Sequence, residues 1–416
     1  MKGAFKTLRH SYTVSVALMM VAAFAETPTV TDVVAKQRYP WNGKVDITYT
    51  VTGNLVAAGL QTLTRPVLSV MATNRVAGTS YVATEDALSG DTGPTEGTHH
   101  VVWDLNAQGL EFKSDDVVFI VAYTTAPFSQ YCVIDLSDGA YAMSYPVTYM
   151  DVLPTEGFNT SEYKTTKLVL RLIEPGSFKM GGSYAVTLTK PFYCGVFEVT
   201  QSQYELVMGT RPSYFTNTSY YATRPVERVS YDMIRGSLAG AGWPGSPSVD
   251  PTSFMGKLRS KTGIDGFDLP TEAQWEYACR AGSTTDYNNG WNYTGIYEEA
   301  SGRSAHLAEV GRYWYNGGEN YSQSCDTSAG TARVGSYLPN AWGLYDMHGN
   351  VKEWCLDWYG DLVGGTMDPT GPSSGTSRVL RGGCWRNNAG LCTSSRRFED
   401  SPSYDEGFRL VRTLSD

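Results

Sequence analysis

The chain has 416 residues, which leaves room for two or three folded domains. Hydrophobic residues make up 41% and charged residues 18%, a composition that excludes a disordered chain. A formal net charge of −9 without a basic cluster argues against nucleic acid and against an anionic membrane as partners.

The first 25 residues have the pattern of a signal peptide. Three basic residues lie within the first nine positions, an apolar run covers residues 14–24, and Ala-Phe-Ala at 23–25 supplies a cleavage site. The apolar run is shorter than the roughly 20 residues that span a bilayer. We therefore expect export to the periplasm, the cell surface or the extracellular medium, and no transmembrane segment after cleavage.

Residues 26–150 are predicted to form an all-β domain, followed by a linker at 151–166. Apolar and polar residues alternate over 45–51 and again over 117–123, which is the period of a strand with one buried face. The pattern G-x-H-x-V-x-W-D…G at 97–109 is similar to a hairpin of bacterial immunoglobulin-like domains. We expect an immunoglobulin-like β-sandwich that serves as a spacer or an adhesion module.

The C-terminal domain, residues 167–416, combines turns with a few strong helix signals. Thr271 and Gln274 form a capping box, in which each side chain bonds the backbone amide of the other residue. Thr200 is a second predicted helix cap, and Asp250 followed by proline begins a third helix.

A series of short motifs follows in this domain. The motifs lie at 175–182, 190–193, 198–201, 224–231, 269–278, 340–347, 349–351, 378–383 and 407–409. In their order and composition they resemble the formylglycine-generating enzyme (sulfatase-modifying factor) family, over residues 168–412. The resemblance implies an α+β, C-type-lectin-like fold with much irregular structure.

The resemblance also implies a copper chemistry that this chain only partly matches. In the family's oxidases two cysteines bind Cu(I) and the substrate thiol, and the metal activates dioxygen to convert a substrate cysteine to formylglycine; soft thiolates select Cu(I). Here Cys392 matches the second cysteine, Asn387 replaces the first, and Cys384 stands where the family has serine. We therefore expect no working copper pair. If catalysis remains, Cys392 is the candidate catalytic residue, with Cys384 as a displaced partner.

Seven cysteines in an exported chain permit disulfides and leave at least one thiol unpaired or bonded to another chain. Many members of the family have a cysteine at the position of Cys392 together with one in the E-W-C motif, which is Cys355 here. The resemblance predicts a structural disulfide between Cys355 and Cys392.

A second metal site follows from the resemblance. Asp346, Gly349, Val351 and Glu353 match a calcium site of the family, with two carboxylates and two backbone carbonyls as ligands. Such hard oxygen ligands are what Ca²⁺ prefers. We expect a structural calcium ion there, and we expect the neighbouring His348 to be an exposed loop residue.

The same fold serves as a display scaffold in the variable proteins of diversity-generating retroelements, which this chain resembles in its C-terminal motifs. That resemblance implies a binding surface of aromatic, amide and charged side chains, the chemistry of adaptable recognition sites. The candidate ligand-binding residues are Trp385, Arg386, Asn387, Asn388, Arg396, Arg397, Glu399 and Tyr404. The ligand expected at this C-terminal loop is a protein or a glycan.

We therefore predict an exported two-domain protein with a binding or structural role. An atypical oxidoreductase that forms formylglycine, with copper as its cofactor, is the main alternative. A variable-protein-type display module is the other.

Overall fold

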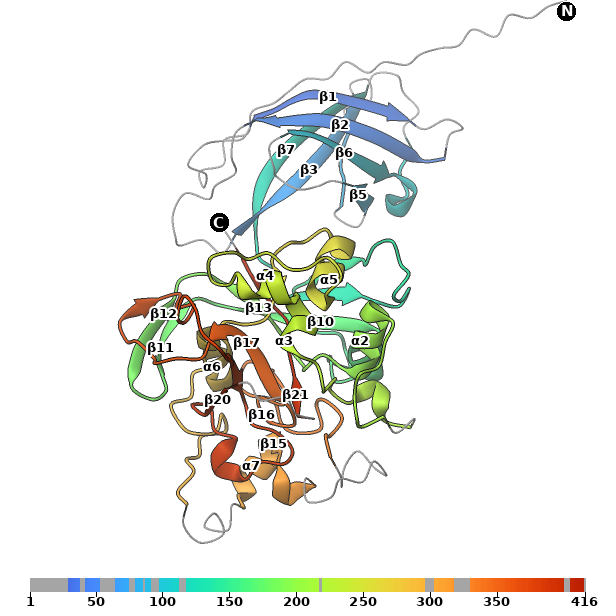
Figure 1. Cartoon of the computed structure of the whole chain (residues 1–416). Helices are drawn as coiled ribbons and strands as arrows, with labels where there is room; N and C mark the ends of the chain where they lie inside the picture. The colour runs from blue at the N-terminus through green and yellow to red at the C-terminus, as the bar shows by residue number, and fades with distance from the viewer. Residues whose placement is uncertain are drawn as a thin grey trace, which may run out of the picture. The chain divides into compact units, whose positions relative to one another are not determined.

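The computed structural model describes residues 29–37, 42–52, 64–74, 79–84, 87–90, 97–111, 117–216, 219–295, 303–317, 330–399 and 405–414 (Figure 1). The chain divides into two compact units, the first ending at Phe128 and the second running from Ser129 to Ser415. The predicted signal peptide and Tyr404 lie outside the described residues. Within the described residues, no helix is both long enough and apolar enough to cross a membrane.

The first unit consists of two antiparallel sheets. One sheet has the order β1-β2-β6-β5, formed by β1 (Thr29–Gln37), β2 (Lys44–Thr52), β6 (Gly97–Asp104) and β5 (Leu88–Gly90). The other has the order β4-β3-β7, formed by β4 (Thr79–Val82), β3 (Thr64–Asn74) and β7 (Val117–Pro127). A 3₁₀ turn, η2 (Asn106–Gln108), follows β6.

The two sheets share one hydrophobic core. Strand β2 alternates between buried and partly exposed residues, as its sequence predicts. Trp103 is buried at the centre, where its ring packs edge to face on Phe119 with centroids 6.3 Å apart and its indole N–H donates to Gln108 Oε1 at 2.7 Å. The β-rich character predicted for this part of the chain is therefore confirmed.

The second unit is built around a six-stranded sheet of order β14-β22-β13-β10-β8-β9. Its strands are β8 (Tyr131–Asp135), β9 (Val147–Met150), β10 (Lys167–Ile173), β13 (Phe192–Gly195), β14 (Phe267–Asp268) and β22 (Val411–Thr413). The sequence predicts a domain boundary near residue 150, whereas the second unit begins at Ser129 and includes β8 and β9. Strand β8 is almost entirely buried and pairs with β10 and β9 of the second unit, and a short helix, α1 (Ser161–Thr165), occupies the stretch predicted to be a linker.

Three smaller sheets complete the strands of this unit. They are β11 (Gly176–Met180) with β12 (Tyr184–Leu188) and β18 (Thr366–Met367); β15 (Gly311–Arg312) with β16 (His348–Gly349); and β20 (Arg397–Glu399), β19 (Arg378–Arg381), β17 (Lys352–Trp358) and β21 (Glu406–Gly407). The helices are α2 (Gln201–Met208), α3 (Tyr231–Arg235), α4 (Ser237–Ala241), α5 (Phe254–Thr262), α6 (Glu272–Arg280) and α7 (Ala305–Val310). The 3₁₀ turns are η3 (Tyr221–Thr223), η5 (Trp314–Asn316) and η6 (Ala389–Leu391). This unit is therefore mixed α+β, as predicted.

Helices α2 and α6 begin where their capping boxes predict. Thr200 and Thr271 each accept a hydrogen bond from the amide three residues later, and the glutamine at that position bonds back. Helix α5 begins later than predicted and has Ser253 as its cap. Asp250 instead accepts from the amide of Thr252 at 2.8 Å, which closes a turn before the helix.

A buried ion pair joins the central elements of the second unit. Arg409 donates to Glu353 through Nε at 2.6 Å and through Nη2 at 2.5 Å, and both side chains are almost fully buried. Glu353 also accepts from the indole N–H of Trp275 on α6 at 2.7 Å. The remaining donors of Arg409 reach the carbonyls of Gly195 and Tyr345 at 2.9 and 3.0 Å. The pair thus links β17, β13, α6 and the C-terminal segment.

We expect Arg409→Met to lower the free energy of unfolding of this unit by about 3–5 kcal/mol, because it leaves the Glu353 carboxylate buried without its cation. Urea denaturation followed by tryptophan fluorescence measures the change. The double variant with Glu353→Gln, which keeps an oxygen for Trp275, is expected to recover part of the loss. Arg333→Met, at an exposed arginine, is the control. A change under about 1 kcal/mol for Arg409→Met would contradict the assignment.

Candidate functional site

The candidate site is the loop that follows β19, residues 382–397, which contains most of the residues singled out from the sequence. Gly382 and Gly383 turn the chain at its start, with φ of 88° and 74°. A Cβ at Gly383 would lie 2.7 Å from the Cys392 sulfur and 2.7 Å from the Leu391 carbonyl oxygen, so no larger residue fits. The two glycines therefore let the loop fold back closely on its own start.

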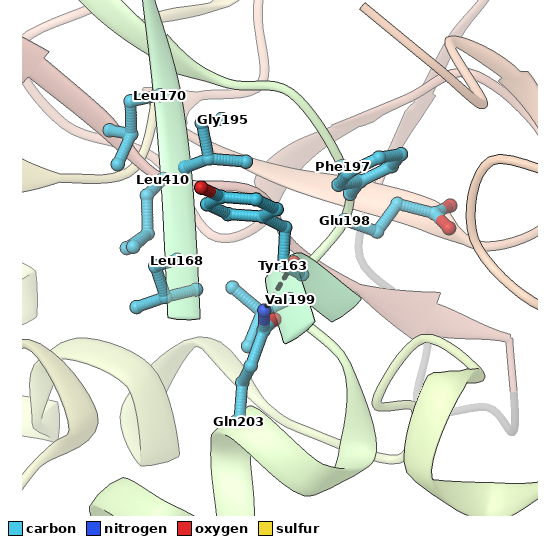
Figure 2. Close-up of a pocket in the computed structure, with 10 residues that line it drawn as sticks. Tyr163, Leu168, Leu170, Gly195, Phe197, Glu198, Val199, Gln203 and Leu410 are labelled. Carbon is cyan, nitrogen blue, oxygen red and sulfur yellow. Dashed lines mark hydrogen bonds between the residues drawn. The ribbon is translucent and has the colours of Figure 1, made fainter. Parts of the chain in front are cut away.

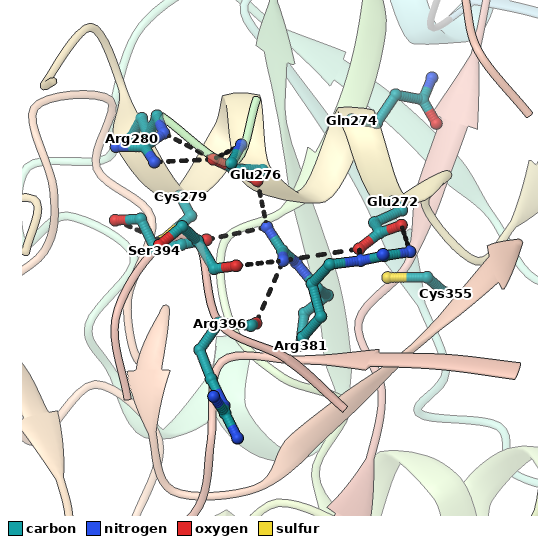
Figure 3. Close-up of polar contacts among 12 residues, drawn as sticks. Glu272, Gln274, Glu276, Cys279, Arg280, Cys355, Arg381, Ser394 and Arg396 are labelled. Carbon is teal, nitrogen blue, oxygen red and sulfur yellow. Dashed lines mark hydrogen bonds and ion pairs between the residues drawn. The ribbon is translucent and has the colours of Figure 1, made fainter. Parts of the chain in front are cut away.

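The buried guanidinium of Arg381 holds the other end of this loop (Figure 3). It pairs with Glu276 and, at 3.5 Å, with Glu272, both on α6. It also donates to three successive backbone carbonyls, those of Ser394 (2.8 Å), Ser395 (3.0 Å) and Arg396 (3.1 Å). The loop backbone is thus fixed to α6 through one side chain.

Two further arginines form ion pairs with the same two glutamates of α6. Arg280 pairs with Glu276 at 2.7 Å, one turn along the helix. Arg397 forms a bidentate pair with Glu272 at 2.6 and 2.8 Å and donates to the carbonyl of Gly360 at 2.6 Å. The sequence predicts that Arg397 faces a ligand. In the structure its guanidinium N–H groups instead bond Glu272 and the Gly360 carbonyl.

Both candidate catalytic thiols are fully buried. Burial raises the pKa of Cys392 to about 12. Burial, reinforced by the neighbouring Asp405 carboxylate, raises the pKa of the Cys384 thiol well above its usual range. The two side chains belong to separate apolar clusters, Cys384 with Phe215 and Cys392 with Tyr287 and others. Because the thiolate is the form that binds a metal or attacks a substrate, neither cysteine is prepared for that chemistry.

Asn387, which replaces the family's first copper cysteine, closes a tight turn. Its Oδ1 accepts from the backbone amide of Cys384 at 3.0 Å and lies 3.1 Å from the Cys384 sulfur, which is also 2.9 Å from Asp405 Oδ2. Its own backbone N–H donates to the Cys384 carbonyl at 2.9 Å, and its carbonyl accepts from Trp314. The amide thus performs a structural task within the loop.

The predicted disulfide between Cys355 and Cys392 is wrong in this structure. Both residues are free thiols, as are the other described cysteines, Cys132, Cys194, Cys279 and Cys384. Cys355 belongs to the main core of the unit and Cys392 to a separate cluster, so the fold does not bring the two sulfurs together.

The predicted ligand-binding residues divide into buried and exposed groups. Trp385 is buried, with its ring edge to face on Phe215 at 5.2 Å, which corrects its assignment to the surface. Arg386 is half-buried and forms a bidentate pair with Asp405 at 2.8 and 3.0 Å. Asn388, Arg396 and Glu399 are exposed.

The predicted calcium ligands are only partly available. Asp346 is buried; its Oδ2 accepts from the Gly335 amide at 2.6 Å, while its Oδ1 has no hydrogen-bond partner. Burial raises the pKa of Asp346 to about 6. Glu353, in contrast, uses both oxygens for Arg409. Across the described ranges, no group of three or more His, Cys, Asp or Glu residues is placed to hold a metal ion. Asp346 therefore fits a cation, whereas Glu353 does not.

A second part of the structure, a small pocket of about 10 Å³, lies beside β10, α1 and α2 (Figure 2). Leu168, Leu170 and Leu410 line it, and the Gln203 amide donates to the Tyr163 carbonyl at 3.1 Å beside it. This volume has room for about one water molecule and is far too small for an organic ligand. The candidate site remains the C-terminal loop.

His348 is fully buried, which corrects the expectation that it is an exposed loop residue. Its Nε2 accepts from the amide of Asn288 at 3.1 Å, so Nδ1 carries the proton and donates to the Cys392 carbonyl at 2.8 Å. Burial lowers the pKa of His348 to about 4. The neutral imidazole thus joins segment 286–293 to the C-terminal loop.

Sequence reasoning missed His348, Arg381 and the two glutamates of α6 as determinants of this site. The glutamates lie in the motif at 269–278, where a helix with acids on its buried face is a usable signal. No local signal identifies the partners of His348, because Asn288 and Cys392 are distant from it in the chain.

The His348 contacts predict a loss of stability in acid. Its folded pKa, about 4, lies below the usual value of 6.5, so between these values the unfolded chain binds a proton that the folded chain lacks. The contribution is complete above pH 6.5 and is lost as the pH falls toward 4, by about 1.4 kcal/mol per pH unit. In urea denaturation at pH 7 and pH 5, His348→Gln is expected to lose less stability on acidification than the parent. His306→Gln, at a partly exposed histidine, is the control, and equal losses for parent and His348→Gln would contradict this account.

Comparison with known proteins finds relatives of the C-terminal part of the chain. The chaperone protein LppX of Paenibacillus barcinonensis is 32% identical over 284 residues, which cover 61% of this chain and 93% of that protein. The formylglycine-generating enzyme of Bos taurus is 32% identical over 252 residues, 53% of this chain and 65% of that enzyme. Among solved structures, Treponema denticola variable protein 1 aligns with a TM-score of 0.46 and 26% identity, covering 60% of this chain and 96% of that one.

The C-terminal part of the chain also matches a known protein family. The family described as the sulfatase-modifying factor enzyme 1-like domain matches residues 156–414, which is more than half of the chain and includes the whole candidate site. The family resemblance read from the sequence motifs is thereby confirmed, and the chain belongs to the family of the sulfatase-modifying factor enzyme 1-like domain.

Proposed function

We propose that the protein is an exported member of this family that binds a ligand and does not act as a copper oxidase. The observation that carries the proposal is the state of the loop at 384–392. The position of the first copper cysteine holds an amide that closes a turn, and the two nearby thiols are buried and protonated.

The ligand preference of Cu(I) supports the proposal that the protein is not a copper oxidase. The metal is held by soft thiolates, and one thiolate with a hard amide is a poor substitute for a pair. Cys392 is packed among apolar residues such as Tyr287, Leu307 and Ala389, where ionising the thiol is costly. Turning Asn387 toward a metal would also remove its bond to the Cys384 amide.

The arrangement of the loop supports a binding role. Arg381 and α6 fix the backbone at 394–396, while Asn388, Arg396 and Glu399 remain exposed. A rigid scaffold that presents adaptable polar side chains is suited to recognition. The Paenibacillus relative, which this chain matches over 93% of its length, is named a chaperone, and a role in contacting another macromolecule fits that name. The proposed ligand is a protein or a glycan.

The first unit has a supporting role in this proposal. Its two antiparallel sheets around Trp103 are compatible with an immunoglobulin-like sandwich. We propose that it acts as a spacer or adhesion module, after a leader directs the chain out of the cytoplasm.

The copper test separates binding from oxidation. Reduced full-length protein is titrated with Cu(I) against a chromogenic chelator and incubated aerobically with a C-x-P-x-R peptide, whose aldehyde product is followed by mass spectrometry. We expect no stoichiometric copper uptake and no aldehyde. Uptake of one Cu(I) that Cys392→Ser abolishes, together with aldehyde formation, would establish the atypical oxidoreductase instead. Cys194→Ser, at a buried thiol outside the loop, is the matched control.

We also propose that a calcium ion stabilises the segment around Asp346. The buried, unpartnered Oδ1 supplies a hard oxygen, and the carbonyls of Gly349 and Val351 are the other ligands that the family resemblance implies. The role of the ion would be structural, and Glu353 would take no part because Arg409 occupies it.

The calcium proposal predicts a shift in thermal stability. Calcium chloride is expected to raise the Tm of the second unit relative to EGTA; occupancy at about 100 times Kd would add about 2.7 kcal/mol. Asp346→Asn is expected to abolish the shift, while Asp138→Asn, at an exposed acid, is expected to retain it. Identical parent melting curves in calcium and EGTA would contradict the proposal.

A further inference from the structure

An exposed tryptophan lies beside the C-terminal loop. Trp291 keeps 51% of its surface exposed, whereas Trp275, Trp354 and Trp385 in the same unit are buried. Leaving a large aromatic ring in water forgoes a substantial hydrophobic gain. The local structure around Trp291 indicates what the ring does there.

The loop that carries Trp291 is rigidly built. The amide of Tyr287 donates to the Trp291 carbonyl at 2.9 Å, across a turn in which Gly290 has φ of 91°. On either side, Asp286 donates its amide to Asn292 Oδ1 at 3.0 Å and accepts the amide of Tyr293 at 3.0 Å. These bonds determine the direction in which the indole projects.

The same loop is attached to the C-terminal loop at several points. The Tyr287 hydroxyl donates to the Ala389 carbonyl at 3.1 Å, and the Ser394 amide donates to the Asp286 carbonyl at 2.8 Å. The ring of Tyr293 lies against Gly390, where a Cβ would come within 2.7 Å of it. The two loops therefore form one continuous surface.

One face of the indole is covered by a histidine. The rings of Trp291 and His306 are stacked with centroids 3.7 Å apart and 7° between their planes. Asn289 donates to the His306 carbonyl at 2.9 Å, which holds the backbone of that histidine at the start of α7. The exposed surface of Trp291 is then its opposite face and its edge, a flat apolar platform with a fixed orientation.

Exposed amides lie on these two joined loops, and the exposed carboxylate of Glu309 on α7 accepts from Asn289 at 3.1 Å. Asn292 follows Trp291 directly, and Asn388 lies two residues from Gly390, on which Tyr293 rests. A pyranose ring matches such a surface: its C–H bonds on one side stack on an indole face, and its hydroxyls exchange hydrogen bonds with amides. We propose that Trp291, with Asn292 and Asn388 on the two joined loops, forms a carbohydrate-binding platform. This inference rests on the proposed binding function and names the class of ligand.

A cationic ligand fits the platform less well than a sugar. Quaternary ammonium groups are usually held by a cage of several aromatic rings. The ring stacked on Trp291 is that of His306, and it covers the indole face that a cage would have to leave open.

Isothermal titration of full-length protein with cellotetraose, chitotetraose and mannotetraose tests the proposal, with choline as the cationic probe. We expect at least one tetrasaccharide to bind the parent. We expect Trp291→Ala to weaken that binding about tenfold or more, a loss of about 1.4 kcal/mol. Trp291→Phe is expected to retain part of it. The control is Leu338→Ala, which removes a side chain that is 61% exposed in the same unit.

The outcomes separate this inference from the proposed function. Absence of binding for all three sugars, or binding of choline alone, overturns the carbohydrate platform and leaves a protein ligand as the binding proposal. Sugar binding that Trp291→Ala leaves unchanged overturns the platform but supports a binding role elsewhere. Circular dichroism that is unchanged in Trp291→Ala ensures that a loss of affinity reports the missing ring. The absence of copper oxidation is tested separately, in the copper and peptide assay.

Discussion

A buried guanidinium on β19 determines how the C-terminal loop and helix α6 are arranged. Arg381 has no access to solvent, so its charge requires anionic partners inside the protein. Glu272 and Glu276 meet that need, which is why the acidic positions of α6 face inward. Its Nη1 and Nη2 also donate to the loop carbonyls at 394–396, so the backbone of the candidate site follows from the same charge.

This constraint also makes the loop backbone independent of the residues at the family's copper positions. The loop is fastened by Arg381 at one end and turned by Gly382 and Gly383 at the other, and none of these residues is a copper ligand. The cysteine position can therefore change to Asn387 without loss of the fold, because the amide closes the turn through hydrogen bonds. The backbone of the loop therefore does not depend on copper-binding residues. A surface beside the loop can take another role.

Local features of the fold could be predicted from the sequence, whereas the environment of the site could not. The caps at Thr200 and Thr271 and the alternation in β2 depend on neighbours a few residues away. The ordered motifs identified the family, and with it the α+β fold. The burial of Trp385 under Phe215 and of His348 beneath the C-terminal loop depends on partners far away in the chain. The type of a side chain does not reveal such partners. The sequence alone therefore does not distinguish the exposed residues of a polar loop from the buried ones.

The strand order of the large sheet has a consequence for the timing of folding. Strand β22, from the last residues of the second unit, lies between β14 and β13 in the sheet interior. Until β22 has emerged during synthesis, that interior position is empty and the facing edges of β14 and β13 stay unsatisfied. The first unit, whose last strand ends at Pro127, has no such dependence. A chain that emerges N-terminus first would thus complete its first unit before β22 can complete the second.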